Sequence, residues 1–382
     1  MRSHQRSDAV TIKSQYFIYF GVMGIFLPYF NLYCYHLGFS GIEIGTLSGV
    51  RSVVLIIFPL VWSSLADHFQ ARRFIYILCN LISAAIWSVF LLTTAFGPML
   101  ILTVLYGIFY APIISFLETF TMDTLGKKKT GYGMMRVWGS VAFIIVVILL
   151  GRIIDRFSIN LIVTLILLGS GIQALIALNI PTRTAINNQP FIFGARHFFK
   201  PKTIVFLFCA FIMLLSHGAY YGFFSIHLEI LGYDRTFIGT CWALASIAEI
   251  VVMVNSKRIF DRFSPPAILV FAFAAAVIRW IALSRVETAA AILLTQALHA
   301  ITYGAFHVAS ILYVDTLSSD EAKTFGQAVN NAVTYGLGLT VGFFVAGILY
   351  EKVGSHQLFA LSALTALFGG VVMSVYYAMH EK

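Results

Sequence analysis

The sequence predicts an all-α membrane protein with twelve transmembrane helices in two pseudo-symmetric six-helix halves. Hydrophobic residues make up 59% of the 382-residue chain and charged residues 11%, long apolar stretches recur along its whole length, and short motifs repeat between its halves. Soluble globular domains carry about 25% charged residues, so an ordinary soluble domain is excluded. The net charge of +9 therefore suggests no nucleic-acid partner, and the lipid bilayer is the expected environment.

Each transmembrane helix needs about 20 mainly apolar residues. Twelve such stretches follow one another along the chain: residues 15–36, 43–66, 74–94, 98–122, 134–154, 159–180, 204–228, 236–256, 267–285, 288–313, 325–349 and 356–378. With the N-terminus inside, the cytoplasmic loops and termini hold 17 of the 25 lysine and arginine residues, and the outer loops hold 5. The positive-inside rule therefore predicts a multi-pass protein of the inner membrane with both termini in the cytoplasm.

The chain lacks the sequence signatures of metal, disulfide or enzyme chemistry. Its cysteines, Cys34, Cys79, Cys209 and Cys241, lie singly in apolar stretches without metal-ligand spacing. No nucleotide-binding loop and no nucleophile–base set is visible. We therefore expect no metal, no cofactor and no enzymatic activity.

Two parts of the chain repeat one another. Residues 37–46 share Leu-Gly and Ile-Gly-Thr with residues 231–240, at a spacing of 194 residues. The tripeptide that begins at Asp123 recurs at Asp315, 192 residues further on. Because such matches appear in order at nearly one spacing, they indicate a duplicated six-helix unit.

The longest internal polar segment separates the two repeats. We predict an N-terminal half at residues 1–180, a cytoplasmic linker at 181–202 and a C-terminal half at 203–382. Parallel six-helix repeats describe the major facilitator architecture.

The ionisable residues inside predicted spans include Arg136, Glu249, Arg279 and His299. A charged side chain at the bilayer centre costs about 3 kcal/mol or more, and chains that keep one commonly use it to bind substrate or to relay protons. These residues therefore point to a transporter of a small-molecule substrate.

The fourth and fifth spans carry the first candidate site. Arg136 shares a helix face with Ser140 and Phe143, and Glu118 is expected at the same depth. The Glu–Arg pair is interpreted as a substrate-binding pair, with a purely structural ion pair as the alternative. The predicted substrate-binding residues are Glu118, Arg136, Ser140, Phe143, Asn31 and Tyr221.

The C-terminal half carries the second candidate site. His299 and His307 share a face of the tenth span, near Glu249 and Arg279. We favour Glu249 as the proton carrier, with His299 or His307 as alternatives and Asp123 or Asp315 less favoured. The predicted gating residues are Asp67, Arg72, Arg73, Asp123 and Asp315.

Several motifs resemble known families. Residues 63–73, with an acid followed by a basic pair, resemble the loop motif of the major facilitator superfamily. Residues 28–45, the Arg-Val-Trp-Gly-Ser motif at 136–140 and the histidine motif at 298–307 resemble the lactose-permease-related branch, and most of all the phenylpropionate permease family.

The resemblance to the lactose-permease-related branch carries implications for single residues. It implies that the Glu118–Arg136 pair binds substrate, and that Arg279 and His299 occupy the arginine and histidine positions of its spans nine and ten. The sequence departs from that branch where the coupled-proton carboxylate falls on Thr302 and the sugar-stacking tryptophan falls on Phe143.

These departures disfavour a sugar, so we expect a proton-coupled symporter of an aromatic or other carboxylate such as phenylpropionate. Arg136 or Arg279 would then be the partner of the anion. The alternatives are a sugar or nucleoside symporter and a drug or metabolite exporter by proton antiport; a non-transporting sensor is a further possibility. The expected functional state is a monomer.

Overall fold

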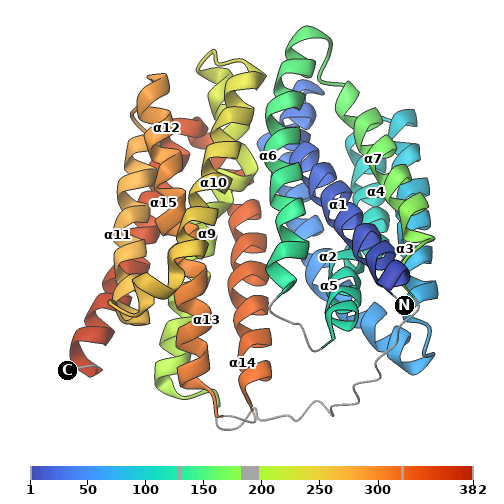
Figure 1. Ribbon diagram of the computed structural model, residues 1–382. Helices are drawn as coiled ribbons and strands as arrows, with labels where there is room; N and C mark the ends of the chain where they lie inside the picture. The colour runs from blue at the N-terminus through green and yellow to red at the C-terminus, as the bar shows by residue number, and fades with distance from the viewer. Residues whose placement is uncertain (1, 127–130, 182–197, 320–321, 381–382) are drawn as a thin grey trace. The chain divides into compact units, whose positions relative to one another are not determined.

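The computed structural model describes residues 2–126, 131–181, 198–319 and 322–380 (Figure 1). Most of the predicted linker at 181–202 therefore lies outside the described residues. Every regular element within the described ranges is a helix, as predicted.

Within residues 2–126 and 131–181, the structure describes seven α-helices and one short 3-10 helix. They are α1 (Arg2–His36), α2 (Gly41–His68), α3 (Arg72–Ser88), η1 (Val89–Leu92), α4 (Phe96–Tyr110), α5 (Pro112–Leu125), α6 (Tyr132–Arg156) and α7 (Leu161–Ala177). The predicted fourth span comprises α4 and α5. These helices meet at Pro112, which has no backbone N–H and so interrupts the hydrogen-bond ladder.

The second part also includes two π-helical segments, in which the wider i→i+5 pattern replaces the α-helical one. Its elements are α9 (Pro201–Ile230), α10 (Arg235–Phe260), α11 (Pro265–Leu283), α12 (Ala289–Ala297), η3 (Ala300–Ala305), α13 (Phe306–Leu317), α14 (Lys323–Asn330), η5 (Asn331–Gly338) and α15 (Leu339–His380). Segment η3 lies inside the predicted tenth span, and η5 lies inside the eleventh.

Among the described residues, ten helical stretches are long and apolar enough to cross a membrane. One of them, Lys323–Met379, contains two predicted spans, which are separated at Gly354 by a φ of 73° and a ψ of 177°. Such a backbone conformation favours glycine because other side chains meet steric clashes there. The sixth predicted span is a shorter apolar helix of 17 residues, Leu161–Ala177. The described helices thus occupy all twelve predicted spans.

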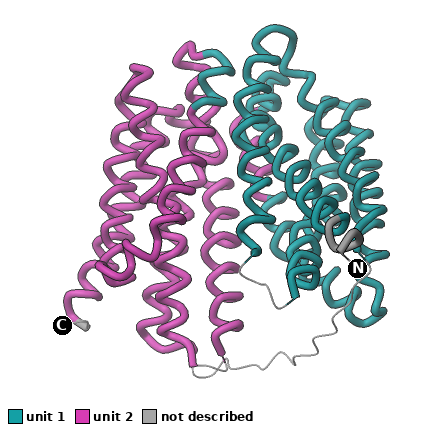
Figure 2. Tube along the Cα trace, in the orientation of Figure 1, with its two compact units in different colours: residues 1–39, 50–188, 234–240 teal, residues 40–49, 189–233, 241–382 magenta. Residues whose placement is uncertain are grey.

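Two compact units emerge from the packing of the chain (Figure 2). Unit 1 comprises residues 1–39, 50–188 and 234–240, and unit 2 comprises residues 40–49, 189–233 and 241–382. In unit 1, α1 packs against α6 and α7, and in unit 2, α15 packs against α9 and α11. Helices α2 and α10 each begin in one unit and continue in the other.

Carboxylates cap the first turns of α10 and α2. In unit 1, Asp155 accepts the backbone N–H groups of Arg235 and Thr236, both at 2.9 Å. In unit 2, Glu351 accepts the backbone N–H of Gly41. A negative charge at a helix N-terminus is favourable because it offsets the helix dipole and satisfies unpaired N–H groups. Gly41 and Arg235 are separated by the repeat spacing of 194 residues, so both repeats begin their second span in the same way.

Helices α9 and α15 approach closely where each carries a glycine. A Cβ atom added at Gly218 would overlap the backbone of Gly342. Small residues at helix crossings let backbones pack directly, which is a common way to join helices in a membrane. This contact anchors the core of unit 2.

Candidate functional site

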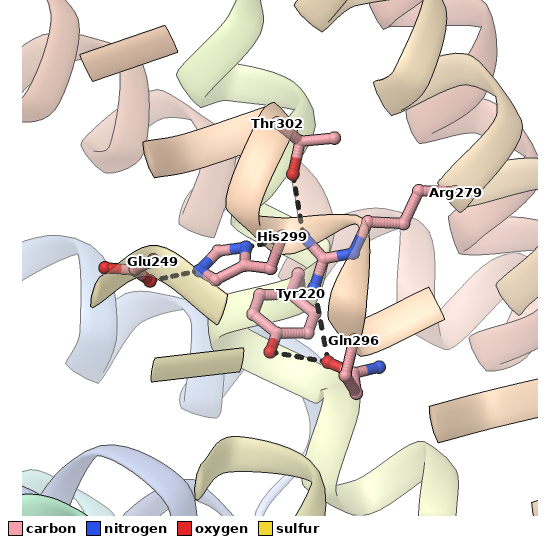
Figure 3. A network of polar contacts seen from close by, with 6 residues as sticks. All are labelled: Tyr220, Glu249, Arg279, Gln296, His299 and Thr302. Atoms are coloured by element: carbon pink, nitrogen blue, oxygen red, sulfur yellow. Dashed lines mark hydrogen bonds and ion pairs between the residues drawn. The ribbon is translucent and has the colours of Figure 1, made fainter. Parts of the chain in front are cut away.

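Three ionisable side chains of unit 2 form a continuous polar chain (Figure 3). Glu249 comes from α10, Arg279 from α11, and His299 from the turn between α12 and η3. His299 Nε2 lies 2.7 Å from Glu249 Oε1, and His299 Nδ1 lies 2.6 Å from Arg279 Nη1. The structure therefore brings these three predicted residues into direct contact.

The guanidinium of Arg279 has further polar partners on the tenth span. Its Nη1 donates to Thr302 Oγ1 at 3.1 Å, and its Nη2 donates to Gln296 Oε1 at 3.3 Å. Gln296 Oε1 also accepts the hydroxyl of Tyr220 at 2.9 Å, as Figure 3 shows. These contacts fix the guanidinium in one orientation.

The contact with Arg279 determines the protonation of His299. Arginine has five N–H donors and no acceptor, so the Nδ1 atom of His299 must accept. The ring proton then lies on Nε2, from which it is donated to Glu249. His299 is therefore a neutral imidazole that joins a cation to a carboxylate.

The three linked side chains differ in burial. Arg279 is 0% exposed and His299 is 2% exposed, whereas the side chain of Glu249 is 22% exposed. The guanidinium of Arg279 also lies 4.2 Å from the ring centre of Tyr220 and 4.7 Å from that of Trp280, which are favourable cation–π distances. Of these three side chains, Glu249 is thus the one most open to exchanging a proton with its surroundings.

Aromatic rings surround His299. Tyr221, which was predicted to bind substrate, lies in this cluster with its ring centre 6.3 Å from that of His299. His217 is 0% exposed; its Nδ1 contacts the carbonyl of Met213 at 2.8 Å, while its Nε2 is buried without a hydrogen-bond partner among the described residues. The surroundings of the Glu249–His299–Arg279 contacts are therefore both apolar and aromatic.

The π-helical segment η3 aligns the side chains of the tenth span. The ring of Tyr303 is nearly parallel to those of His299 and His307, at interplanar angles of 17° and 7°. His307 Nδ1 contacts the hydroxyl of Tyr335 on η5 at 2.5 Å. His307 thus lies on the predicted face, and its Nδ1 meets a tyrosine of the next span.

Unit 1 holds the other predicted pair. Arg136 Nε on α6 lies 3.8 Å from Glu118 Oε1 on α5, and both side chains are 43% exposed. Tyr132 donates its hydroxyl to the same carboxylate oxygen at 3.2 Å. A separation of 3.8 Å is too long for a direct hydrogen bond, so the two half-exposed side chains form a loose ion pair.

The other residues predicted to bind substrate divide between the units. Ser140 and Phe143 follow Arg136 along α6, and both are half-buried. Asn31 is half-buried on α1, also in unit 1. Tyr221 belongs to unit 2.

The predicted gating residues make short-range contacts. Arg72 pairs with Asp67 at 2.6 Å, within one loop region. Arg73 donates to the carbonyls of Ile180 and Leu178 at 3.0 and 2.7 Å, which satisfies the C-terminal end of α7.

The second pair of predicted gating residues lies at helix ends. Asp315 pairs with Lys323 at 3.3 Å, and Asp123 lies near the end of α5.

Sequence reasoning missed the partners of Arg279. Gln296 and Thr302 lie three residues before and after His299, so helical spacing could have placed them on its face. Tyr220 had no comparable signal, because the neighbouring Tyr221 is equally aromatic. The orientation of α9 decides which tyrosine meets Gln296.

Known proteins resemble the chain over nearly its full length. A protein of Escherichia coli (strain K12) named "Probable 3-phenylpropionic acid transporter" is 28% identical over 361 residues, which cover 92% of this chain and 93% of the relative. A maltose permease of Geobacillus stearothermophilus is 24% identical over 378 residues, covering 96% and 94% of the two chains.

Solved structures share the fold. The crystal structure of the nucleoside transporter NupG matches with a TM-score of 0.85 at 17% identity, over 98% of this chain and 99% of the other. A bacterial homologue of the human lysosomal transporter Spinster matches with a TM-score of 0.78 at 13% identity, over 98% and 97%. The helical arrangement is therefore the major facilitator fold.

The sequence model of the MFS_1 like family matches residues 9–361. That match spans most of the chain and includes both the Glu118–Arg136 pair and the Glu249–His299–Arg279 chain. The protein is accordingly a membrane transporter that belongs to the MFS_1 like family of the major facilitator superfamily.

Proposed function

We propose that the protein is a proton-coupled symporter of a small aromatic carboxylate, of the size and chemistry of phenylpropionate, and that it works by alternating access. The observation that carries this proposal is the Glu249–His299–Arg279 chain, because it places an exchangeable carboxylate next to a buried, fixed cation. The similarity to a protein named as a 3-phenylpropionic acid transporter supports the solute class.

Glu249 is the proposed proton carrier. Since His299 stays neutral while it accepts from Arg279, the proton that enters and leaves resides on the carboxylate. Protonation of Glu249 removes the negative charge that offsets Arg279. The protein then gains one positive charge, which favours the binding of an anion.

The solute itself is proposed to contact unit 1 through Glu118 and Arg136. Their long separation leaves hydrogen-bonding capacity for polar groups of a solute. Ser140, Phe143 and Asn31 are proposed to complete this polar and aromatic surface. Within unit 2, Tyr221 is proposed to bind substrate beside His299. Asp67, Arg72, Arg73, Asp123 and Asp315 are proposed to act in gating.

This proposal has an electrical consequence. One proton moving with one monocarboxylate carries no net charge, so the membrane potential does not drive uptake. The pH gradient does, and one pH unit supplies about 1.4 kcal/mol, or about tenfold accumulation. A neutral solute moving with a proton would instead use the potential, at about 2.3 kcal/mol per 100 mV.

The experiment is transport in liposomes that hold a pH-sensitive dye. We expect phenylpropionate to acidify the interior of vesicles containing the protein, at a rate unchanged when a potassium gradient with valinomycin sets the potential. A panel of other carboxylates, sugars and nucleosides tests the solute class. Acidification by none of the carboxylates would overturn the proposal.

A proton-coupled sugar symporter is the second candidate function. The half-exposed Glu118–Arg136 pair is suited to hydroxyl groups as well as to carboxylates, and a maltose permease is among the relatives. Acidification by a sugar that depends on the membrane potential would favour this candidate.

A further inference from the structure

A third arginine lies within a predicted span, and its partners differ from those of the other two. The charge of Arg136 is offset by Glu118, and that of Arg279 by Glu249 through His299. For Arg51 on α2, the described part of the chain provides no ion-pair partner.

Arg51 does not lie at a helix end, where a long side chain could extend into water. It follows the start of α2 by ten residues, or roughly 15 Å at 1.5 Å per residue. That distance is about half of a 30 Å hydrocarbon core. A cation at this depth without a partner is costly, so its retention calls for an anion.

The contacts of Arg51 are weak ones. Its Nη2 lies 3.8 Å from the sulfur of Met23, and its guanidinium lies 4.0 Å from the ring centre of Phe26. A thioether is a weak acceptor, and a ring face satisfies charge without accepting in-plane hydrogen bonds. The in-plane donors of the half-buried guanidinium therefore retain capacity for an acceptor.

Two buried tyrosines of α4 lie near this arginine. Tyr106 and Tyr110 are 4% and 3% exposed, and neither hydroxyl makes a hydrogen bond of good geometry to a described residue. Gly107, which follows Tyr106, packs against Val54 of α2, about one turn beyond the arginine. The two tyrosines are four residues apart, so they lie on one face of α4, and Tyr19 stacks on Tyr110 at 5.2 Å.

These groups share one chemical property, which is that each can donate to an acceptor. A buried tyrosine hydroxyl without a partner loses the free energy of a hydrogen bond, and guanidinium binds carboxylates through two parallel bonds. We propose that Arg51, Tyr106 and Tyr110 form a subsite of unit 1 that binds the carboxylate of the solute, with Phe26 and Tyr19 as apolar walls.

This subsite rests on the proposed function for its ligand, and it gives that function a specificity. A carboxylate offers only hydrogen-bond acceptors, and its negative charge supplies the counter-ion that Arg51 lacks. A primary amide of the same shape offers one acceptor and no charge. The subsite therefore selects aromatic monocarboxylates against their neutral amides.

The first test is calorimetric titration of the purified protein with 3-phenylpropionate and 3-phenylpropanamide. Because hydrogen bonds to charged groups contribute about 1.5–3 kcal/mol, we expect the carboxylate to bind about tenfold or more tightly than the amide. Arg51→Gln and the double variant Tyr106→Phe/Tyr110→Phe should weaken binding of the carboxylate alone. Arg152→Gln, which removes an exposed arginine from α6, is the charge-matched control.

The second test needs no substitution. Phenylglyoxal modifies accessible arginines, and peptide mass spectrometry locates the product. We expect 3-phenylpropionate, but not the amide, to protect Arg51 in the wild-type protein. Labelling that the carboxylate does not reduce would overturn the subsite, and so would an Arg51 that the reagent cannot reach.

The outcomes separate this inference from the proposed function. Carboxylate selectivity that disappears in Arg51→Gln supports the subsite even if no proton flux accompanies binding. Coupled uptake of phenylpropionate with unchanged affinity in Arg51→Gln overturns the subsite and leaves the proposed function standing. A wild-type protein that does not distinguish the acid from the amide also overturns the subsite.

Discussion

His299 donates its Nε2 proton to Glu249 across 2.7 Å, because the other ring nitrogen is occupied by a guanidinium that can only donate. The imidazole is thus held neutral between two charges. In this arrangement the carboxylate exchanges protons, and the neutral histidine links the carboxylate to the guanidinium of Arg279. Each of these two roles can be tested.

Replacing Glu249 by glutamine should abolish uphill uptake. The amide keeps the size of the side chain but cannot bind or release a proton, so accumulation driven by a pH gradient should fall from about tenfold per pH unit to none. Exchange of internal for external solute should persist. Glu287→Gln, at an exposed glutamate, is the control, and undiminished accumulation by Glu249→Gln would reject Glu249 as the carrier.

Replacing His299 by glutamine should retain part of the coupling. A neutral amide can accept from Arg279 and donate to Glu249, as the imidazole does. Phenylalanine can do neither and would leave buried charges unpaired, at a cost of about 3–5 kcal/mol in stability. Coupled uptake and thermal unfolding distinguish these outcomes. A folded His299→Gln protein without any coupling would show that the imidazole itself titrates.

Replacing Arg136 by lysine should weaken binding of phenylpropionate by roughly threefold to tenfold. An ammonium group cannot reproduce the planar fork of donors that guanidinium presents. Calorimetric titration measures the effect. Unchanged affinity would indicate that the Glu118–Arg136 pair serves only to join α5 and α6.

Replacing Gly218 by alanine should destabilise unit 2. The added methyl group would overlap the backbone of Gly342, and overpacking of this kind costs about 1–3 kcal/mol. Gly171 on α7 has open space at its Cβ position, so Gly171→Ala should be neutral or slightly stabilising. A lower thermal midpoint for the first variant alone would meet this expectation, and equal midpoints would contradict it.

Sequence reasoning predicted the fold and the meeting of Glu249, Arg279 and His299 for one physical reason. Apolar surroundings make an unpaired charge costly, so charges on separate spans are expected to find one another. The same reasoning could not identify Gln296 or Tyr220 as partners of the guanidinium. Their contacts depend on how each helix is rotated about its axis, and an apolar stretch constrains that rotation only weakly.

The caps of α2 and α10 escaped prediction for a different reason. Asp155 and Glu351 read as ordinary charges at the ends of spans, because their partners are backbone N–H groups that have no sequence signature. The repeat spacing between Gly41 and Arg235 was visible. What it predicted was a duplication rather than a contact.

The π-helical segment η3 determines which side chains of the tenth span share a face. His307 follows His299 by eight residues, and an unbroken α-helix would place it about 80° around the axis from His299. A π-turn holds one residue more than an α-turn, so the extra residue is taken up and the two histidines stay on one face. Deleting Ala300 would restore the α-helical ladder with a spacing of seven residues between them, which is about 20° from two full turns. Loss of a single codon would therefore preserve this face, whereas closing the π-turn without a deletion would turn His307 away from Tyr335.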